Sequence, residues 1–181
     1  MNVFVDRMLR AAKLDVHLYE EVEADKNAMP QAMGVVILAS VAAGIGTMGM
    51  GGASAGGFVL GIVASLGGWY LWAFLTYFIG TRFLPEPQTH ADMGELLRTI
   101  GFSSSPGLIR ILGIIPGLGA LVFFLAAVWM LVAMVIAVRQ ALDYTSTWRA
   151  VGVCAIGWVI QTIILVIVFA LFGGGAPPPA G

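Results

Sequence analysis

Charged residues are scarce in this chain, which has nine Lys and Arg and ten Asp and Glu among 181 residues. They make up 10% of the sequence, against roughly 25% in a soluble domain. A net charge of −1 gives no electrostatic basis for nucleic-acid binding. Apolar residues make up 59%, and helices that are apolar on every face are covered by lipid rather than water. The composition therefore predicts one membrane domain.

Cysteine and histidine are also scarce. Cys154 is the single cysteine, which excludes an internal disulfide and a multi-cysteine zinc site. His17 and His90 have no other histidine or cysteine near them, so we expect exposed histidines and neither a metal nor a cofactor. No Asp, Glu or His falls in an expected span, and intramembrane hydrolysis would need a base, paired carboxylates or metal ligands there. We therefore expect no enzyme.

Long apolar stretches are what the sequence has instead, and they predict an all-α polytopic membrane bundle of five transmembrane helices. The stretches are 31–48, 58–80, 106–115, 118–138 and 148–172. The third is only about ten residues, or roughly 15 Å at 1.5 Å per residue. It crosses a membrane only with flanking residues or through a thinned bilayer, and a re-entrant helix is the alternative.

Proline and glycine residues mark both ends of this third expected helix. A serine cap followed by Pro106 is a strong start signal, and Pro116-Gly117 ends the helix. Arg110, one turn in, is the only charged residue between Pro106 and Val138. A charge inside a span indicates a functional or pairing role. Snorkelling to nearby headgroups is an equally good interpretation.

Two polar segments flank the apolar stretches. The alternation of apolar and basic residues at 2–26 predicts a short amphipathic helix in the headgroup layer. A solvated helix that leads into the first span is the alternative. The acidic residues at 20–25 are expected to be solvated. Asp92 and Glu95 form a capping-box pattern that begins a short helix, whose apolar face we expect along the cytoplasmic surface.

Five charged residues are candidates for a functional or structural cluster near the cytoplasmic face. Arg139 and Asp143 are four apart and can pair on one helix face. The expected network locks the surface helix to the hairpin that follows it. Its members are Glu95, Arg98, Arg110, Arg139 and Asp143.

The second expected span carries two further patterns. Gly57, Gly61 and Ser65 form a small-residue stripe that favours close helix contact. Tryptophans and tyrosines at 69–77 are typical of an interfacial belt, and a ligand cage is the less favoured alternative. In the last span, Gln161 is expected to donate a hydrogen bond to a neighbouring helix.

Loop charges predict the orientation. With five spans, every loop Lys and Arg falls on one side, which the positive-inside rule makes cytoplasmic. Four spans would place Arg139 and Arg149 outside, against the rule. The charge-free outer side argues against an external enzyme site or receptor.

Three blocks in this order resemble the Yip domain family of five-span membrane proteins. They are LDVHLYEEVEADKNAMPQA, ELLRTIGFSSSPGLIRILGIIPGLG and VWMLVAMVIAVRQALDYTSTWRA. The resemblance, to the family's bacterial members, implies a cytoplasmic N-terminus and no catalytic activity. Eukaryotic relatives act in vesicle trafficking and bind small GTPases. This chain has only a short N-terminal segment, so we do not expect GTPase binding to carry over.

Together these features give a cytoplasmic segment at 1–30, a membrane domain at 31–172 and a disordered tail at 173–181. We expect a multi-pass protein of the bacterial inner membrane that contacts lipids and other membrane proteins or copies of itself. Its expected role is a scaffold, a trafficking or organisation factor, or an accessory subunit of a membrane complex. The alternative is a lipid or small-solute translocator that uses the interrupted third helix and Arg110.

Overall fold

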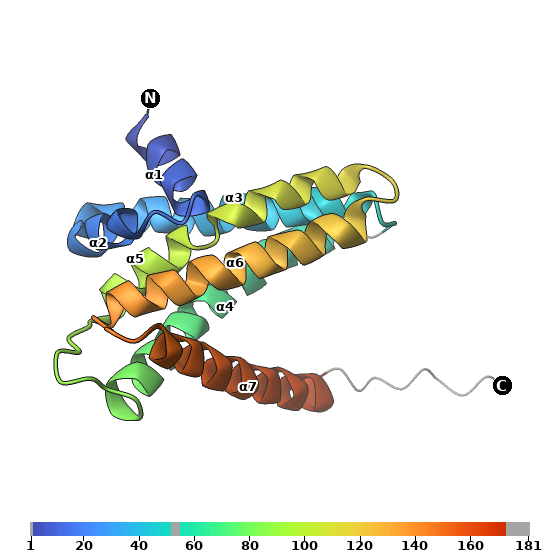
Figure 1. Ribbon diagram of the computed structural model, residues 1–181. Helices are drawn as coiled ribbons and strands as arrows, with labels where there is room; N and C mark the ends of the chain where they lie inside the picture. Colours follow the sequence, from blue (N-terminus) through green and yellow to red (C-terminus); the bar gives the residue numbers. More distant parts are fainter. Residues whose placement is uncertain (1, 52–54, 173–181) are drawn as a thin grey trace.

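The structure is a computed structural model that describes residues 2–51 and 55–172. All regular elements in these residues are helices, shown in Figure 1. They are α1 (Val3–Ala12), α2 (Val16–Ala24), η1 (Lys26–Ala28), α3 (Met29–Met48), α4 (Ala55–Arg82), α5 (Met93–Phe102), η2 (Ser105–Ile114), α6 (Gly119–Ala141) and α7 (Thr147–Phe172). The expected disordered tail at 173–181 lies outside the described residues.

Four described helices are long and apolar enough to cross a membrane. They coincide with the first, second, fourth and fifth expected spans and comprise α3, α4, α6 and α7. The chain is thus a multi-pass helical membrane protein, and the count of five spans is approximate. The short third expected span is not among these four helices and forms η2.

The third expected span is a ten-residue 3₁₀ helix rather than an α-helix. A 3₁₀ helix rises about 2.0 Å per residue, so η2 extends roughly 20 Å instead of 15 Å. It lies against α3 and α6, and Gly113 is beside Gly46 of α3. The stretched geometry lets ten residues reach the same end of the bundle as α3 (Figure 1).

The polar segments gather at one end of the bundle, on the left of Figure 1. We call this the charged end; it comprises α2, α5 and the loops 83–92 and 142–146. The opposite, uncharged end holds the last turn of α3 and the 115–118 turn between η2 and α6 (Figure 1). This arrangement agrees with the segregation of loop charges that five crossings require.

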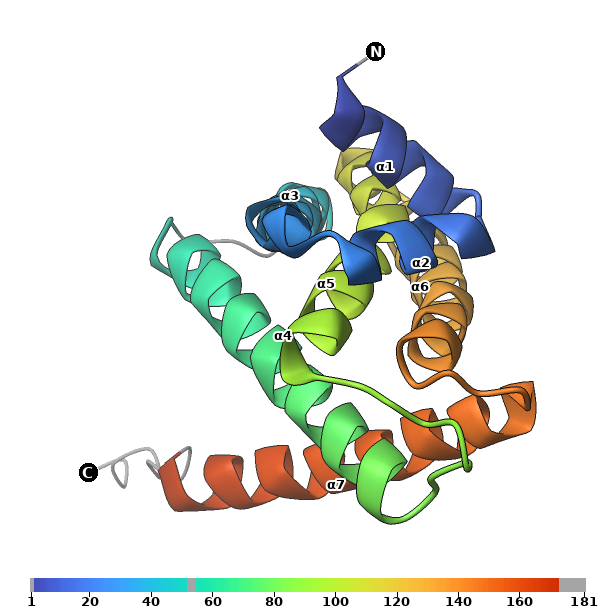
Figure 2. The same ribbon diagram turned by 90° about the vertical axis from the view of Figure 1, so that its left-hand side faces the viewer.

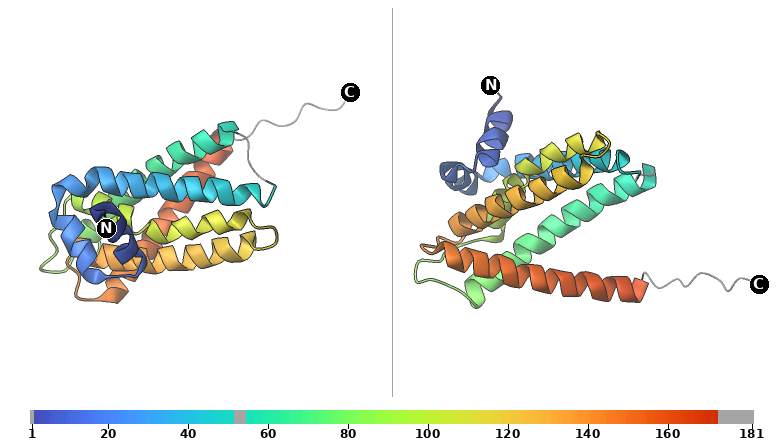
Figure 3. Two further views of the ribbon diagram at one scale, coloured as in Figure 1. Left: turned by 90° about the horizontal axis from the view of Figure 1, so that it is seen from above. Right: turned by 45° about the vertical axis from the view of Figure 1, so that its right-hand side comes forward.

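The buried core also lies toward the charged end. It joins α2, α3, α5 and the halves of α4, α6 and α7 that adjoin the charged loops. Farther along, α4 meets α3 only at its first turns, where Phe58 is beside Gly44, and the last half of α7 stands apart from the rest (Figures 2 and 3). Large apolar side chains are exposed there, including Leu60, Val63 and Leu165. In a membrane protein such surfaces face lipid or a partner.

The N-terminal segment is two helices rather than one. The chain turns between α1 and α2, where Leu14 has a φ of 63°. Leu18, Tyr19 and Val22 of α2 are fully buried in the core, so α2 is part of the folded domain. α1 leaves Val5 and Leu9 exposed, as an interfacial helix does.

The expected capping box is present at the start of α5. Asp92 accepts a hydrogen bond from the Glu95 amide at 2.8 Å, and Glu95 accepts one from the Asp92 amide at 2.7 Å. The helix does not lie along the surface, however. All residues from Leu96 to Phe102 are buried, because α5 packs between α2, α3, α4 and α6.

Candidate functional site

An arginine cluster fastens α1 to the rest of the charged end. Arg7 donates to Glu21 at 2.9 Å, to Asp25 at 2.8 Å and to Gln31 at 3.0 Å. Arg10 donates to Glu21 at 2.5 Å, and this bond is the main reason that the pKa of Glu21 is lowered. The acidic residues expected to be solvated are therefore partly paired.

A second cluster at the charged end surrounds Glu86. Its side chain is 6% exposed and accepts hydrogen bonds from the Thr145 amide and hydroxyl at 2.9 and 2.8 Å. These bonds, led by that of the amide, lower the pKa of Glu86. Arg149 lies 3.2 Å from the same carboxylate. The cluster ties the α4–α5 loop to the start of α7.

Glu23 gives the charged end a pH dependence. Burial, followed by the charges of Glu95 and Asp143, raises its pKa from 4.5 to about 7. The folded state therefore holds a proton that the unfolded state releases between these pH values. The free energy of unfolding should fall as the pH rises from 4.5 to about 7.

We predict that Glu23→Gln removes this dependence and raises the melting temperature more at pH 8 than at pH 5. Thermal unfolding in detergent at the two pH values measures the effect. Asp6→Asn, which removes a carboxylate in α1 that is not among the charges acting on Glu23, is the control. An equal shift for Glu23→Gln at both pH values would contradict the assignment.

The candidate charged residues do not form one network. Arg98 donates to the backbone carbonyls of Val22 and Glu23, and so ties α5 to α2. Arg139 donates to the carbonyls of Tyr144 and Thr145 at 3.2 and 3.4 Å. Glu95 serves in the capping box.

The expected Arg139–Asp143 ion pair is not formed among the described residues. The reason is that α6 ends at Ala141 and Asp143 adopts a left-handed φ of 52°. The four-residue spacing therefore no longer places the two side chains on one helix face.

Arg110 lies at the uncharged end, away from the other four candidates. Its carbonyl oxygen is beside Gly46, near the end of α3, so Arg110 does not share one face of the bundle with the other four, as the expected cluster required. Its guanidinium lies 5.7 Å from the centroid of the Phe123 ring. The Arg110 Nε is buried without a hydrogen-bond partner in the described part of the chain.

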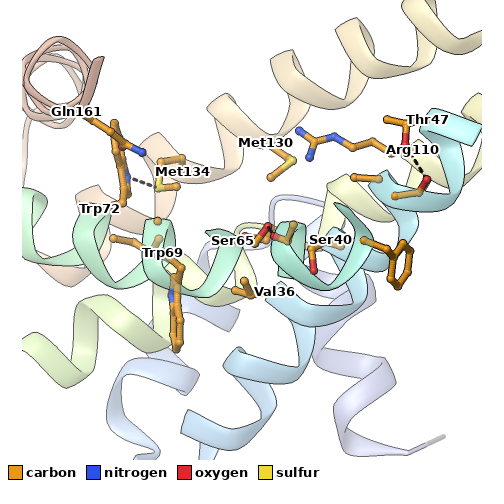
Figure 4. Close-up of a pocket in the computed structure, with 18 of the residues that line it drawn as sticks. Val36, Ser40, Thr47, Ser65, Trp69, Trp72, Arg110, Met130, Met134 and Gln161 are labelled. Atoms are coloured by element: carbon orange, nitrogen blue, oxygen red, sulfur yellow. Dashed lines mark hydrogen bonds between the residues drawn. The ribbon is translucent and has the colours of Figure 1, made fainter. Parts of the chain in front are cut away.

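Arg110 lines a pocket of about 470 Å³ inside the membrane bundle. Figure 4 shows its side chain directed from η2 into the pocket, toward Met130. Helices α3, α4, α6 and α7 also contribute lining residues. They include Ser40, Thr47, Gly61, Ser65, Trp69, Trp72, Met134 and Gln161.

The patterns noted in the second span belong to this pocket. Trp69 is 9% exposed and donates to the Leu97 carbonyl at 3.0 Å, so it packs in the bundle rather than in an interfacial belt. Trp72 donates to the Met134 sulfur at 3.2 Å (Figure 4). A side chain at Gly61 would meet nothing within 4 Å. The small residue there leaves space open instead of bringing helices together.

Close helix contact occurs elsewhere, between α3 and η2. A Cβ atom at Gly46 or Gly49 would overlap backbone oxygens of η2. The signal available in the sequence was the pair Gly46 and Gly49, which lies at the end of the first span rather than in the second. Small residues there allow η2 to lie directly against α3.

Comparison with known proteins supplies a family. No curated protein and no solved structure matches the chain significantly. The model of the Yip1 domain family matches residues 28–169. The match includes η2 and nearly all of the four long helices, and therefore the whole pocket around Arg110. Because it covers most of the sequence, the chain belongs to the Yip1 domain family.

Proposed function

We propose that this multi-pass membrane protein is a non-enzymatic scaffold, trafficking or organisation factor, or an accessory subunit of a membrane complex. The observation that supports this proposal is an apolar groove between α6 and α7 that is open to the outside of the bundle. It has a volume of about 780 Å³, and its lining includes Leu131, Val135, Val151 and Trp158. A helix of a second copy or of another membrane protein fits such a surface, since membrane helices associate by close packing.

Cross-linking in native membranes tests the proposal. In a Cys154→Ala background, Val159→Cys places a thiol in the groove, and Leu60→Cys places one on an exposed position of α4 outside it. Oxidation should join Val159→Cys to the same cysteine of a second copy or, with a thiol-to-amine cross-linker, to a lysine of a co-purifying protein, whereas Leu60→Cys should not be joined. A monomer without a cross-linked or co-purifying protein would contradict the proposal.

The proposed location is a bacterial cytoplasmic membrane, with the charged end and the N-terminus in the cytoplasm. Support comes from the loop Lys and Arg at one end, because positive loops stay inside. Again without Cys154, an impermeant maleimide on intact cells should label Ile115→Cys and leave Ser146→Cys unlabelled. The reverse pattern would invert the topology.

A second candidate function is translocation of a lipid or small solute. It is favoured by the pocket at Arg110, since interrupted helices often border transport sites. Reconstituted liposomes should then show lipid or solute flux above empty vesicles. Flux equal to that of empty vesicles would remove this candidate and leave the scaffold proposal standing.

A further inference from the structure

We propose that the pocket around Arg110 binds the phosphate group of a membrane phospholipid, with part of one acyl chain along the adjoining apolar wall. This inference concerns binding alone. It holds for a scaffold as well as for a translocator, and it names the phosphate group as the part of the lipid that the pocket recognises.

The first reason is that Arg110 needs an anion which the protein does not supply. Burying a guanidinium in a span is costly unless it is paired. None of the ten Asp and Glu lies in α3, α4, η2, α6 or α7. The Phe123 ring offers the cation a π-face, but it leaves the Arg110 Nε without an acceptor.

The second reason is the supply of polar groups in the same pocket. Ser104 and Gln161 line it, and in the described part of the chain their side chains form no hydrogen bond. Ser40, Thr47 and Ser65 donate to their own helix carbonyls, so their hydroxyl protons are already used. Figure 4 shows Gln161 beside Trp72 and Met134, away from Arg110, so Arg110 is the charged donor for an anion and Gln161 can meet polar groups farther along the ligand.

The third reason is the amphipathic shape of the pocket. Arg110 lies toward the uncharged end, whereas Trp69, Trp72 and Met134 form an apolar wall farther along (Figure 4). A small inorganic anion would use only the arginine region. A phospholipid would place its phosphate at Arg110 and its chain against the tryptophans, and Gly61, which is exposed, leaves a lateral opening to the bilayer.

Native mass spectrometry of the purified protein with phosphatidylglycerol tests the proposal. One lipid should stay bound, whereas diacylglycerol with the same chains should not. Arg110→Gln should weaken retention by about ten- to hundredfold, since a hydrogen bond to a charged group is worth about that factor. Arg82→Gln, at an exposed position of α4, should bind as the parent does.

A second variant blocks the pocket and leaves the charge in place. Gly61→Phe introduces a ring where a Cβ atom meets nothing within 4 Å, so the fold should be kept and the lipid displaced. Gly67→Phe, equally open but outside the pocket lining, should retain the lipid. Thermal unfolding of each variant confirms that it is folded before binding is compared.

Inorganic phosphate separates the two possible sources of the anion. Adding it alone should neither raise the melting temperature nor compete with the lipid. Stabilisation by inorganic phosphate without lipid retention would make this a free-anion site and overturn the lipid assignment. Equal retention of diacylglycerol, or unchanged retention by Arg110→Gln and Gly61→Phe, would overturn it as well.

Discussion

Gly46→Ala should destabilise the protein although it adds a single methyl group. The new Cβ atom would overlap the Arg110 carbonyl oxygen, which belongs to the η2 backbone and cannot rotate away. Overpacking of this kind costs about 1–3 kcal/mol, and here it would separate α3 from η2. We expect a clearly lowered melting temperature in detergent.

The matched control is Gly67→Ala in α4. A Cβ atom there meets nothing within 4 Å, and alanine favours a helix over glycine by up to about 1 kcal/mol. The control should be neutral or slightly stabilised. Similar melting temperatures for Gly46→Ala and Gly67→Ala would show that α3 and η2 are not in close contact.

Arg7→Met should release α1 from the charged end. Arg7 is 7% exposed, and its loss leaves Glu21 and Asp25 with one hydrogen-bonded cation fewer. Breaking a fully buried pair costs about 3–5 kcal/mol. These carboxylates are 39% and 30% exposed, so solvent screening reduces the expected loss to about 1–3 kcal/mol.

Limited proteolysis with chymotrypsin, which can cleave after Leu14 and does not depend on Lys13, measures the release directly, because cleavage between α1 and α2 should become faster. Lys13→Gln is the control, since Lys13 is exposed beside the same turn and should leave the cleavage rate unchanged. Equal protection of α1 in Arg7→Met and the parent protein would mean that the arginine cluster does not hold this helix.

The hydrophobic pattern and the composition of the sequence were sufficient to predict several features of the fold. The four long helices follow from apolar runs, and the start of α5 follows from the Asp92–Glu95 capping box, because both signals are local in the sequence. The membrane assignment and the family follow from the same local information. Helix formation and lipid exposure depend mainly on which residues lie within a few turns of each other.

The site depended on contacts between distant segments. The four-residue spacing suggested that Arg139 would pair with Asp143. The pair does not form in the described part of the chain because α6 ends at Ala141, before Asp143. Arg7 has its partners far along the chain. The sequence suggested that Glu21 and Asp25 are solvated. They accept hydrogen bonds from Arg7 only because α1 folds back onto α2.

What the sequence by itself determined is that this chain is a helical membrane protein whose loop charges belong on one side. Hydrophobic runs and loop charge are enough for that, since lipid and headgroups respond to each segment separately. Only the tertiary structure decided that η2 is a stretched 3₁₀ helix that takes Arg110 to the uncharged end. That result needed the glycine contact between α3 and η2. The pocket around Arg110 is enclosed by α3, α4 and α6, and no described residue of these helices supplies the arginine with a counter-charge.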